Sequence, residues 1–387
     1  MVLGMGVRFI IGPAGSGKTQ HIIDSVCDYI LSRKKGANYP PLLVIVPDQT
    51  TFQIETSILA DGRVKGFTDL QVLGFRRLAL KVLEDTGGYN FPFITPVGRS
   101  MAVQAILWEF RNHLSIYKPM VDYPGFRDTL IRTFSEFRAY GVNPEELLVD
   151  TEESRDHAPF LSQKLADIHL IYSEYRNFIS DRFLDPDDYL ELAVPRICES
   201  DMVKNALVWI DGFSGFTPLE YQVIGEIIEN ALCVEICLCM DREELQHPVR
   251  ETSLFHPVRE IYEKITEICL DRNIPIEGTV FLGEDEVLPR FEHPSLLGVE
   301  LEFRNKDRPR KTVKKQPPDQ LSDESYDEGS LGFRSEQLGG IFLVEAVNPR
   351  AEVEFVAREI TKLVRDQEVA FRDLTLGLRD LALYAEL

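Results

Sequence analysis

The sequence predicts an α/β fold in which a parallel sheet is interrupted by an all-helical insertion. Short apolar runs alternate with segments of helical periodicity near the N-terminus, and the same alternation returns after about residue 200. Between them, apolar residues recur at helical spacing and no convincing strand is found. A charged stretch then precedes the start of a second α/β unit. The expected segments, in chain order, are 1–97, 98–200, 201–303, 304–340 and 341–387.

A glycine-rich loop follows the first expected strand, residues 7–11. It reads Gly12-Pro13-Ala14-Gly15-Ser16-Gly17-Lys18-Thr19, the pattern G-x-x-x-x-G-K-T. A helical pattern begins directly after it, so the loop joins a strand to a helix, which is the setting of a phosphate-binding P-loop. We therefore expect all eight residues to bind a nucleoside triphosphate, with Lys18 on the outer phosphates and Thr19 on Mg²⁺. The alternative is a glycine-rich turn that binds nothing.

Composition narrows the class of protein. The chain has 387 residues, which exceeds what one ordinary core holds, so two or three domains are expected. Its net charge of −21 argues against a generally basic nucleic-acid coat but leaves room for a local basic groove. Six cysteines are too few for a disulfide framework, and neither a signal peptide nor an apolar run of ~20 residues is found. With a nucleotide site, this favours the cytoplasm and no membrane.

The remaining strands of the sheet are expected at four places. Apolar runs stand at residues 42–46, 70–73, 206–211 and 232–240. Helices are expected at about 52–59, from Phe75, after Thr217 and over 257–270. Such alternation predicts a parallel sheet with helices on both faces, whose carboxyl edge binds ligands.

Asp211 ends one of these strands and is the second candidate site residue. A carboxylate there is typical of the group that holds Mg²⁺ in P-loop ATPases, although an Asp before Gly212 is also found in turns and helix caps. In such enzymes the next residue is normally acidic and orients the attacking water. Here that position is Gly212, and the next acidic residue, Glu220, is explained by a capping box that starts at Thr217. We therefore expect Lys18 and Asp211 to be catalytic only in a slow reaction.

Three other patterns favour structure over chemistry. Cys233, Cys237 and Cys239 fall on one face of a strand and are interpreted as small buried hydrophobes. Aromatic residues in the helical insertion are interpreted as core residues and not as base-stacking platforms. The basic run from Arg304 to Lys315 and the acidic stretch after it are interpreted as a solvated or disordered linker.

The last segment reads as the beginning of a further α/β unit. Strands are expected at 341–344 and 373–378, with a helix over 351–364 between them. Because about 45 residues are too few for such a domain, we expect the chain to be part of a longer protein.

Several blocks together resemble the AddB family, the B subunits of AddAB-type ATP-dependent helicase–deoxyribonucleases. They are the loop with its strand (9–19), Val46-Pro47-Asp48-Gln49-Thr50, Trp209-Ile210-Asp211-Gly212-Phe213, Phe216-Thr217-Pro218-Leu219-Glu220, Glu345-Ala346 and 352–357. The similarity runs from residue 6 to the end and is least diagnostic over 304–340.

This resemblance implies a superfamily 1 helicase-like, RecA-like architecture. The first motor domain (1A) would comprise 1–97 and 201–303, with 98–200 as its 1B-like insertion and 341–387 as the start of a 2A-like domain. The family implies ATP and Mg²⁺ as ligands, an AddA-type partner, and single-stranded and duplex DNA ends processed in recombinational repair. It further implies a nuclease domain with a [4Fe-4S] cluster, to which none of the six cysteines maps, and a motor that does not drive unwinding.

Two other functions stay open at this point. One is a free-standing P-loop ATPase or small-molecule kinase, with the helical insertion as a substrate lid. The other is a non-catalytic scaffold in which ATP holds the fold together.

Overall fold

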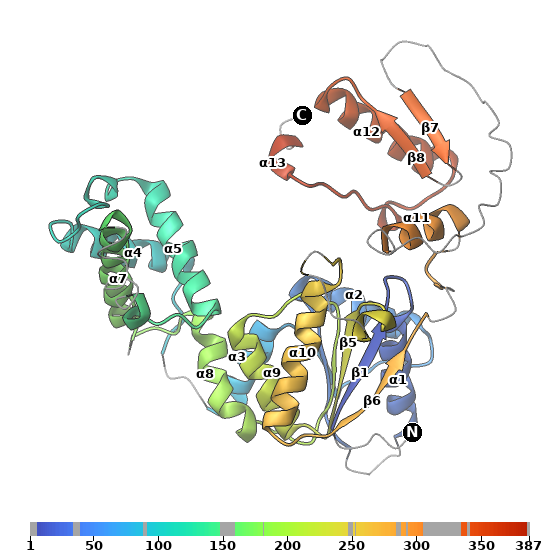
Figure 1. Cartoon of the computed structure of the whole chain (residues 1–387), viewed down its shortest axis with the longest axis horizontal. Helices are drawn as coiled ribbons and strands as arrows, with labels where there is room; N and C mark the ends of the chain where they lie inside the picture. Colours follow the sequence, from blue (N-terminus) through green and yellow to red (C-terminus); the bar gives the residue numbers. More distant parts are fainter. Residues whose placement is uncertain are drawn as a thin grey trace. The chain divides into compact units, whose positions relative to one another are not determined.

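A six-stranded parallel sheet forms the centre of the first of two compact units, residues 1–288 (Figure 1). The computed structural model describes residues 6–33, 39–87, 91–147, 159–180, 182–246, 251, 253–283, 288–291, 293–304, 334–338 and 341–384. The strand order is β3-β2-β4-β5-β1-β6, and every neighbouring pair is parallel. The strands are β1 (Gly6–Gly12), β2 (Leu42–Ile45), β3 (Leu70–Leu73), β4 (Leu207–Ile210), β5 (Cys233–Cys239) and β6 (Ile276–Phe281).

The five predicted strands of this sheet are all present, and the predicted α/β class with a parallel sheet is confirmed. The sixth strand, β6, was not predicted. Gly278 interrupts its apolar pattern with a φ of +73°, and its register against β1 shifts between Val7 and Phe9. Its position after a helix in an α/β alternation is the signal that could have revealed it.

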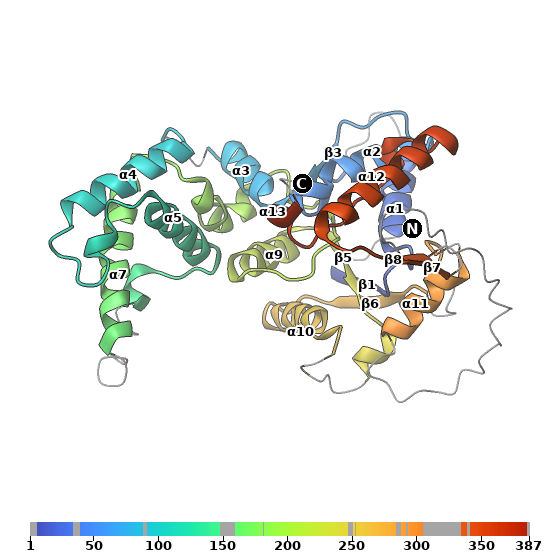
Figure 2. The same ribbon diagram turned by 90° about the horizontal axis from the view of Figure 1, so that it is seen from above.

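Helices cover both faces of the sheet. Those that pack on it are α1 (Lys18–Ser32), α2 (Thr51–Ala60), α3 (Phe75–Asp85), α8 (Tyr189–Ala193), α9 (Pro218–Asn230) and α10 (His256–Asp271). Short 3-10 turns are η1 (Asp48–Thr50), η4 (Val194–Glu199) and η5 (Arg242–Leu245). Figure 2 shows α1 and α2 on the opposite side of the strands from α9 and α10.

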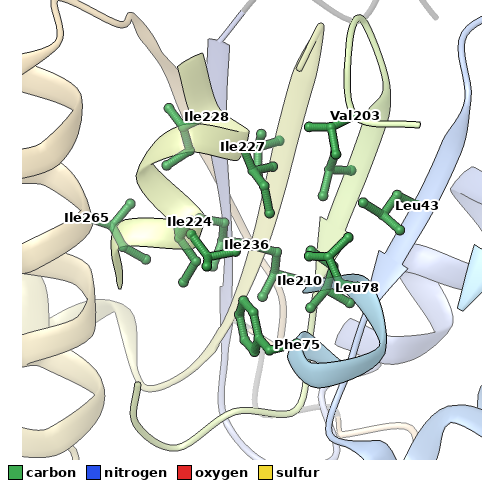
Figure 3. Close-up of a cluster of buried hydrophobic side chains, with 14 of the residues drawn as sticks. Leu43, Phe75, Leu78, Val203, Ile210, Ile224, Ile227, Ile228, Ile236 and Ile265 are labelled. Carbon is green, nitrogen blue, oxygen red and sulfur yellow. The ribbon is translucent and has the colours of Figure 1, made fainter. Parts of the chain in front are cut away.

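Alternation along each strand divides the core into two clusters. Phe9 and Ile11 of β1 face the cluster that includes α3, α8, α9 and α10, while Ile10 faces the one beneath α1 and α2. Figure 3 shows part of the larger cluster, where Phe75 and Leu78 of α3 approach Ile210 of β4. Because both faces are covered, β2 and β4 are buried over their whole length, as expected for central parallel strands.

The face of the sheet beneath α1 and α2 also buries an ion pair. Glu235 of β5 is 3% exposed, accepts a 3.0 Å hydrogen bond from Arg8 and a 2.8 Å bond from the Trp209 indole. Arg8 and Glu235 are register partners on neighbouring strands. These bonds satisfy the carboxylate, which otherwise would be costly to bury.

The segment between β3 and β4 is helical and carries its own core. Its main helices are α4 (Pro96–Glu109), α5 (Pro124–Ala139) and α7 (Pro159–Ile179), with 3-10 turns η2 (Lys118–Met120) and η3 (Pro186–Asp188). Among their aromatic residues, Phe134 is buried against Tyr172 and Tyr175, and Phe126 and Phe137 are partly buried in the same core. Trp108 is 62% exposed and is an exception to the interpretation of these aromatic residues as core. No strand occurs among the described residues from 98 to 200, where one isolated bridge joins Leu184 to Phe93.

A buried ion cluster ties these helices to the chain that leads back to the sheet. Asp185 is fully buried, pairs with Arg99 of α4 and with Arg138 of α5 at 2.6 Å, and accepts a 2.8 Å bond from Tyr175. Arg138 also lies 3.3 Å from Asp188. The cluster therefore joins α4, α5, α7 and η3 through one carboxylate.

The second unit, residues 289–387, contains α11 (Pro294–Arg304), β7 (Arg334–Leu338), β8 (Ile341–Glu345), α12 (Pro349–Asp366), η6 (Phe371–Asp373) and α13 (Leu381–Tyr384). β7 and β8 form an antiparallel pair, so strand structure occurs within the stretch expected to be a linker. Residues 305–333 and 339–340 of that stretch lie outside the described residues.

The strand predicted at 373–378 was wrong. This stretch begins in a 3-10 turn and continues without regular structure, and it pairs with no strand in the described part of the unit. Leu376 is 59% exposed. Alternating apolar residues are not enough for a strand, because a strand needs a neighbour to receive its backbone hydrogen bonds.

Candidate functional site

The loop between β1 and α1 has the backbone of a cradle. Gly15 and Gly17 have φ values of +76° and +91°, in the left-handed region that favours glycine. A side chain at Gly12 would bring its Cβ against the Ser16 hydroxyl and within 2.7 Å of the Leu282 carbonyl oxygen. Geometry thus favours glycine at all three positions; Gly12 and Gly17 are the two that the pattern in the sequence specifies.

Lys18, the first residue of α1, turns its side chain back over this loop. Its ammonium group donates hydrogen bonds of 2.7 Å to the Gly12 carbonyl and 2.8 Å to the Pro13 carbonyl. The α1 N-terminus has no side-chain cap, so its first backbone N–H groups are available to an anion.

Ser16 adds a polar atom without a partner. Its side chain is 6% exposed, and its hydroxyl makes no hydrogen bond in the described structure. A buried hydroxyl without a partner costs roughly 1–3 kcal/mol, so the loop is incomplete as it stands. An oxygen-rich ligand in the cradle would satisfy it.

Thr19 and Asp211 lie 192 positions apart in the sequence and are in contact in the structure. The Thr19 hydroxyl donates a 2.7 Å hydrogen bond to the Asp211 carboxylate, which is 7% exposed. Asp211 directly follows β4, and Thr19 is the second residue of α1, the helix that follows β1; in the sheet, β5 lies between β4 and β1. The parallel sheet therefore places both groups at one carboxyl edge, where ligands bind in open α/β sheets.

The thiol of Cys237 lies beside the same carboxylate. Burial first, and then the Asp211 charge, raise the pKa of the Cys237 thiol well above its ordinary value. Cys233 is also buried and burial raises its pKa to about 11, so both thiols stay protonated at neutral pH. Cys239 is half-buried. The burial of Cys233 and Cys237 agrees with their interpretation as small core side chains, whereas Cys239 is only partly buried.

Gly212 follows Asp211 in a conformation that disfavours other residues. Its φ is +83°, and a Cβ there would lie 3.3 Å from Cδ of Pro47. A carboxylate at this position would require a strained backbone and a shift of the Pro47 ring. The next acidic residue, Glu220, is used in a helix cap. Its carboxylate accepts a 2.7 Å hydrogen bond from the Thr217 backbone N–H, and its own backbone N–H donates a 3.3 Å hydrogen bond to the Thr217 hydroxyl. The predicted capping box is confirmed.

The chain resembles known proteins over almost its whole length. A family model described as "ADDB, N-terminal" matches residues 9–300. The chain belongs to the AddB N-terminal family. Its relatives include the B subunit of an ATP-dependent helicase/deoxyribonuclease from Pelotomaculum thermopropionicum, 38% identical over 99% of this chain and 31% of the relative. B subunits of the same name from Moorella thermoacetica and Desulforamulus reducens are 34% and 35% identical, with the same coverage. The chain thus spans about a third of the relatives' length.

Other features of this AddB-family chain bear on its ligands. Among the described residues, no group of three or more His, Cys, Asp or Glu side chains has the arrangement of a metal site, and no helix is long and apolar enough to cross a membrane. The basic run predicted as a linker begins at Arg304, the end of α11, and its other residues lie outside the described part.

Sequence reasoning missed the third side of the cradle. The chain after β6 closes on the loop, where the Leu282 backbone N–H donates a 2.8 Å hydrogen bond to the Ile11 carbonyl. Gly283 follows with a φ of +75°, and a Cβ there would lie 2.9 Å from Cδ2 of Leu288 and 3.1 Å from Cβ of Ser16, so there is no room for a side chain. The pair Leu282-Gly283 at a strand end is the signal that could have indicated this.

Proposed function

We propose that residues 12–19, together with Asp211, bind Mg·ATP. The observation that carries the proposal is the Thr19–Asp211 contact, because a hydroxyl and a carboxylate at nearby strand ends are the ligands that Mg²⁺ takes in P-loop enzymes. The donor set fits the rest of the ligand: the loop N–H groups and Lys18 suit phosphate oxygens, and Ser16 has an unused hydroxyl. Bound Mg²⁺ would offset the negative charge of the phosphates, and Asp211 would hold the metal ion in position.

We further propose that the sheet is a P-loop, RecA-like motor domain. Its support is the parallel sheet with the glycine loop after β1 and an acidic residue after β4 at the same edge. In this proposal residues 1–97 and 201–303 form domain 1A, 98–200 a 1B-like insertion, 304–340 a linker and 341–387 the start of a 2A-like domain.

In the cell, the chain would be the N-terminal helicase-like part of the B subunit of a helicase–nuclease that processes DNA double-strand breaks. The support is family membership and the relatives' name, which specifies ATP dependence, a helicase, a deoxyribonuclease and the place of a B subunit. Its partners would be an AddA-type protein and single-stranded DNA at duplex ends. Nuclease activity and a [4Fe-4S] cluster would belong to the length of the relatives that this chain does not match.

The motor would bind ATP but hydrolyse it slowly. Phosphoryl transfer depends on positioned groups, and the position after Asp211 that usually orients water is a glycine in a left-handed conformation. Lys18, Thr19 and Asp211 could hold the nucleotide without it. ATP binding would then shape the DNA-processing protein and contribute little to movement.

The test is phosphate release from Mg·ATP by the purified chain, with and without single-stranded DNA. We expect slow release that Lys18→Ala abolishes. Rapid release without DNA would contradict the slow motor. Transfer of the γ-phosphate to a small metabolite would contradict the helicase assignment and favour a kinase.

A further inference from the structure

A wide cleft lies in the helical segment, on residues that the proposed nucleotide site does not use. It has a volume of about 1330 Å³ and lies between the start of α3, one side of α4, one side of α5 and η3. Small-molecule sites are typically about 300–1,000 Å³, so this cleft is large for one metabolite. A polymer that lies along it is a better match in size.

One wall of the cleft is an exposed apolar stripe on α4. Val97, Met101 and Trp108 follow one another at spacings of four and seven residues, so they share a helix face. They are 68%, 68% and 62% exposed. The opposite face of α4 carries Val103 and Leu107, which are fully buried in the core of the segment. The exposed stripe therefore takes no part in packing α4 against the core of the segment.

Arginines stand around this stripe, and two of them have no acidic partner among the described residues. Arg99 is committed to the buried Asp185 cluster, and Arg127 pairs with its neighbour Asp128 at 3.3 Å. Arg76 lies over the Tyr189 ring at 5.9 Å, and the Arg132 guanidinium donates a 3.4 Å hydrogen bond to the Asp128 carbonyl. Within the described residues, neither Arg76 nor Arg132 has a carboxylate within ion-pair distance.

Charge decides which occupant fits. The chain carries a net charge of −21, and most of its described arginines are paired with carboxylates. Two guanidinium groups without a carboxylate partner in the described structure therefore make this cleft locally more positive than the chain as a whole. An exposed indole beside them offers a flat surface for stacking. Single-stranded nucleic acid is held by this combination, with bases on aromatic rings and phosphates on arginines.

We propose that this cleft binds single-stranded DNA, with bases against Trp108 and Met101 and backbone phosphates on Arg76 and Arg132. It would be a contact separate from the nucleotide site. The inference rests on the proposed function in DNA processing, which supplies the strand. A duplex is a poorer match, because its bases are stacked on one another and unavailable to the indole.

Intrinsic fluorescence reports on the cleft directly. The chain has two tryptophans, and Trp209 is 1% exposed in the sheet, so quenching by DNA would come from Trp108. Titration with oligo(dT) of about 20 nucleotides should give saturable quenching. Arg76→Glu and Arg132→Glu should each weaken binding at least about fivefold and lower the salt dependence, since each removes a phosphate contact.

The matched control is Arg111→Glu, which changes charge equally in the same segment but lies outside the cleft and pairs with Asp122. It should change the affinity less than about twofold. No quenching by oligo(dT), an equal loss in Arg111→Glu, or equal quenching by poly-glutamate would overturn the proposal. Quenching by the AddA-type partner and not by DNA would overturn it in favour of a protein interface.

Nucleotide binding separates the two proposals. If Mg·ATP binds and depends on Lys18 while oligo(dT) fails to quench Trp108, the cleft inference falls and the proposed function stands. If oligo(dT) binds in the cleft and Mg·ATP does not bind, the cleft inference stands and the nucleotide site falls.

Discussion

The Thr19 hydroxyl donates a 2.7 Å hydrogen bond to the Asp211 carboxylate across the end of an intervening strand. Thr19 is exposed and Asp211 is nearly buried, so the pair presents one open side. No local sequence pattern around either residue predicts this contact. It forms because β4, β5 and β1 are adjacent parallel strands, whose carboxyl ends lie at the same edge of the sheet.

Asp211→Asn should remove the Mg²⁺ dependence of ATP affinity. The amide keeps the size of the carboxylate and a hydrogen bond to Thr19, but it lacks the charge that attracts the cation. Fluorescent ATP should bind the variant about equally with Mg²⁺ and with EDTA, whereas the parent should bind about tenfold more tightly with Mg²⁺. Asp201→Asn, an exposed position before β4, is the control and should behave as the parent. Retained Mg²⁺ dependence in Asp211→Asn would assign the metal elsewhere.

Gly212→Glu should destabilise the fold without restoring rapid hydrolysis. The φ of +83° disfavours a side chain by about 1–2 kcal/mol, and the Cβ must also displace Pro47. Urea unfolding measures the loss. Gly215→Glu is the matched control in the same loop, where φ is not positive and no atom lies within 4 Å of the added Cβ, so it should cost less than about 0.5 kcal/mol. Fast, stable hydrolysis by Gly212→Glu would show that the turn adapts.

Asp185→Asn should unfold the helical segment or weaken it strongly. Arg138 is 3% exposed and loses its closest charged partner, and an uncompensated buried charge costs about 3–5 kcal/mol. Asp122→Asn breaks the exposed pair with Arg111 and should cost less than about 1 kcal/mol. Urea unfolding followed by circular dichroism compares the two. Equal, small effects would mean that Asp188 alone can balance Arg138.

The buried thiols predict a loss of stability in alkali. Burial raises the pKa of Cys233 and of Cys269 from 9.0 to about 11, so the folded state disfavours both thiolates. Their contribution to the free energy of unfolding is complete below pH 9, which is the pKa of the thiols in the unfolded chain, and it is lost as the pH rises toward 11. The double variant Cys233→Ala/Cys269→Ala should therefore lose less stability than the parent between about pH 8 and pH 10.5 in urea unfolding. Equal losses would show that other groups cause the change.

Sequence alone located the loop, Asp211 and the sheet, because each depends on local signals or on a general property of parallel strands. A buried strand followed by glycines and a helix leaves few alternatives for residues 12–19, and strand ends of a parallel sheet share one edge. The capping box at Thr217 depends on four consecutive residues and was equally readable.

Other features depend on distant neighbours. Asp185 meets Arg99 and Arg138 from separate helices, so no local pattern reveals the cluster. β6 is interrupted by Gly278 and was hidden, whereas 373–378 alternates well but pairs with no strand in the described part. Exposure of Trp108 also needed the structure, since helical periodicity cannot tell which side of α4 stays uncovered.

Calorimetric titration of the chain with Mg·ATP tests the central claim most directly, with Lys18→Ala as the variant and Lys65→Ala, an exposed lysine, as the control. Lys18 is the cation over the loop, so its loss should weaken binding by at least about tenfold, while Lys65→Ala should bind as the parent does. Binding of Mg·ATP that is equally tight in Lys18→Ala, or no binding by the parent chain, would contradict a nucleotide site at residues 12–19.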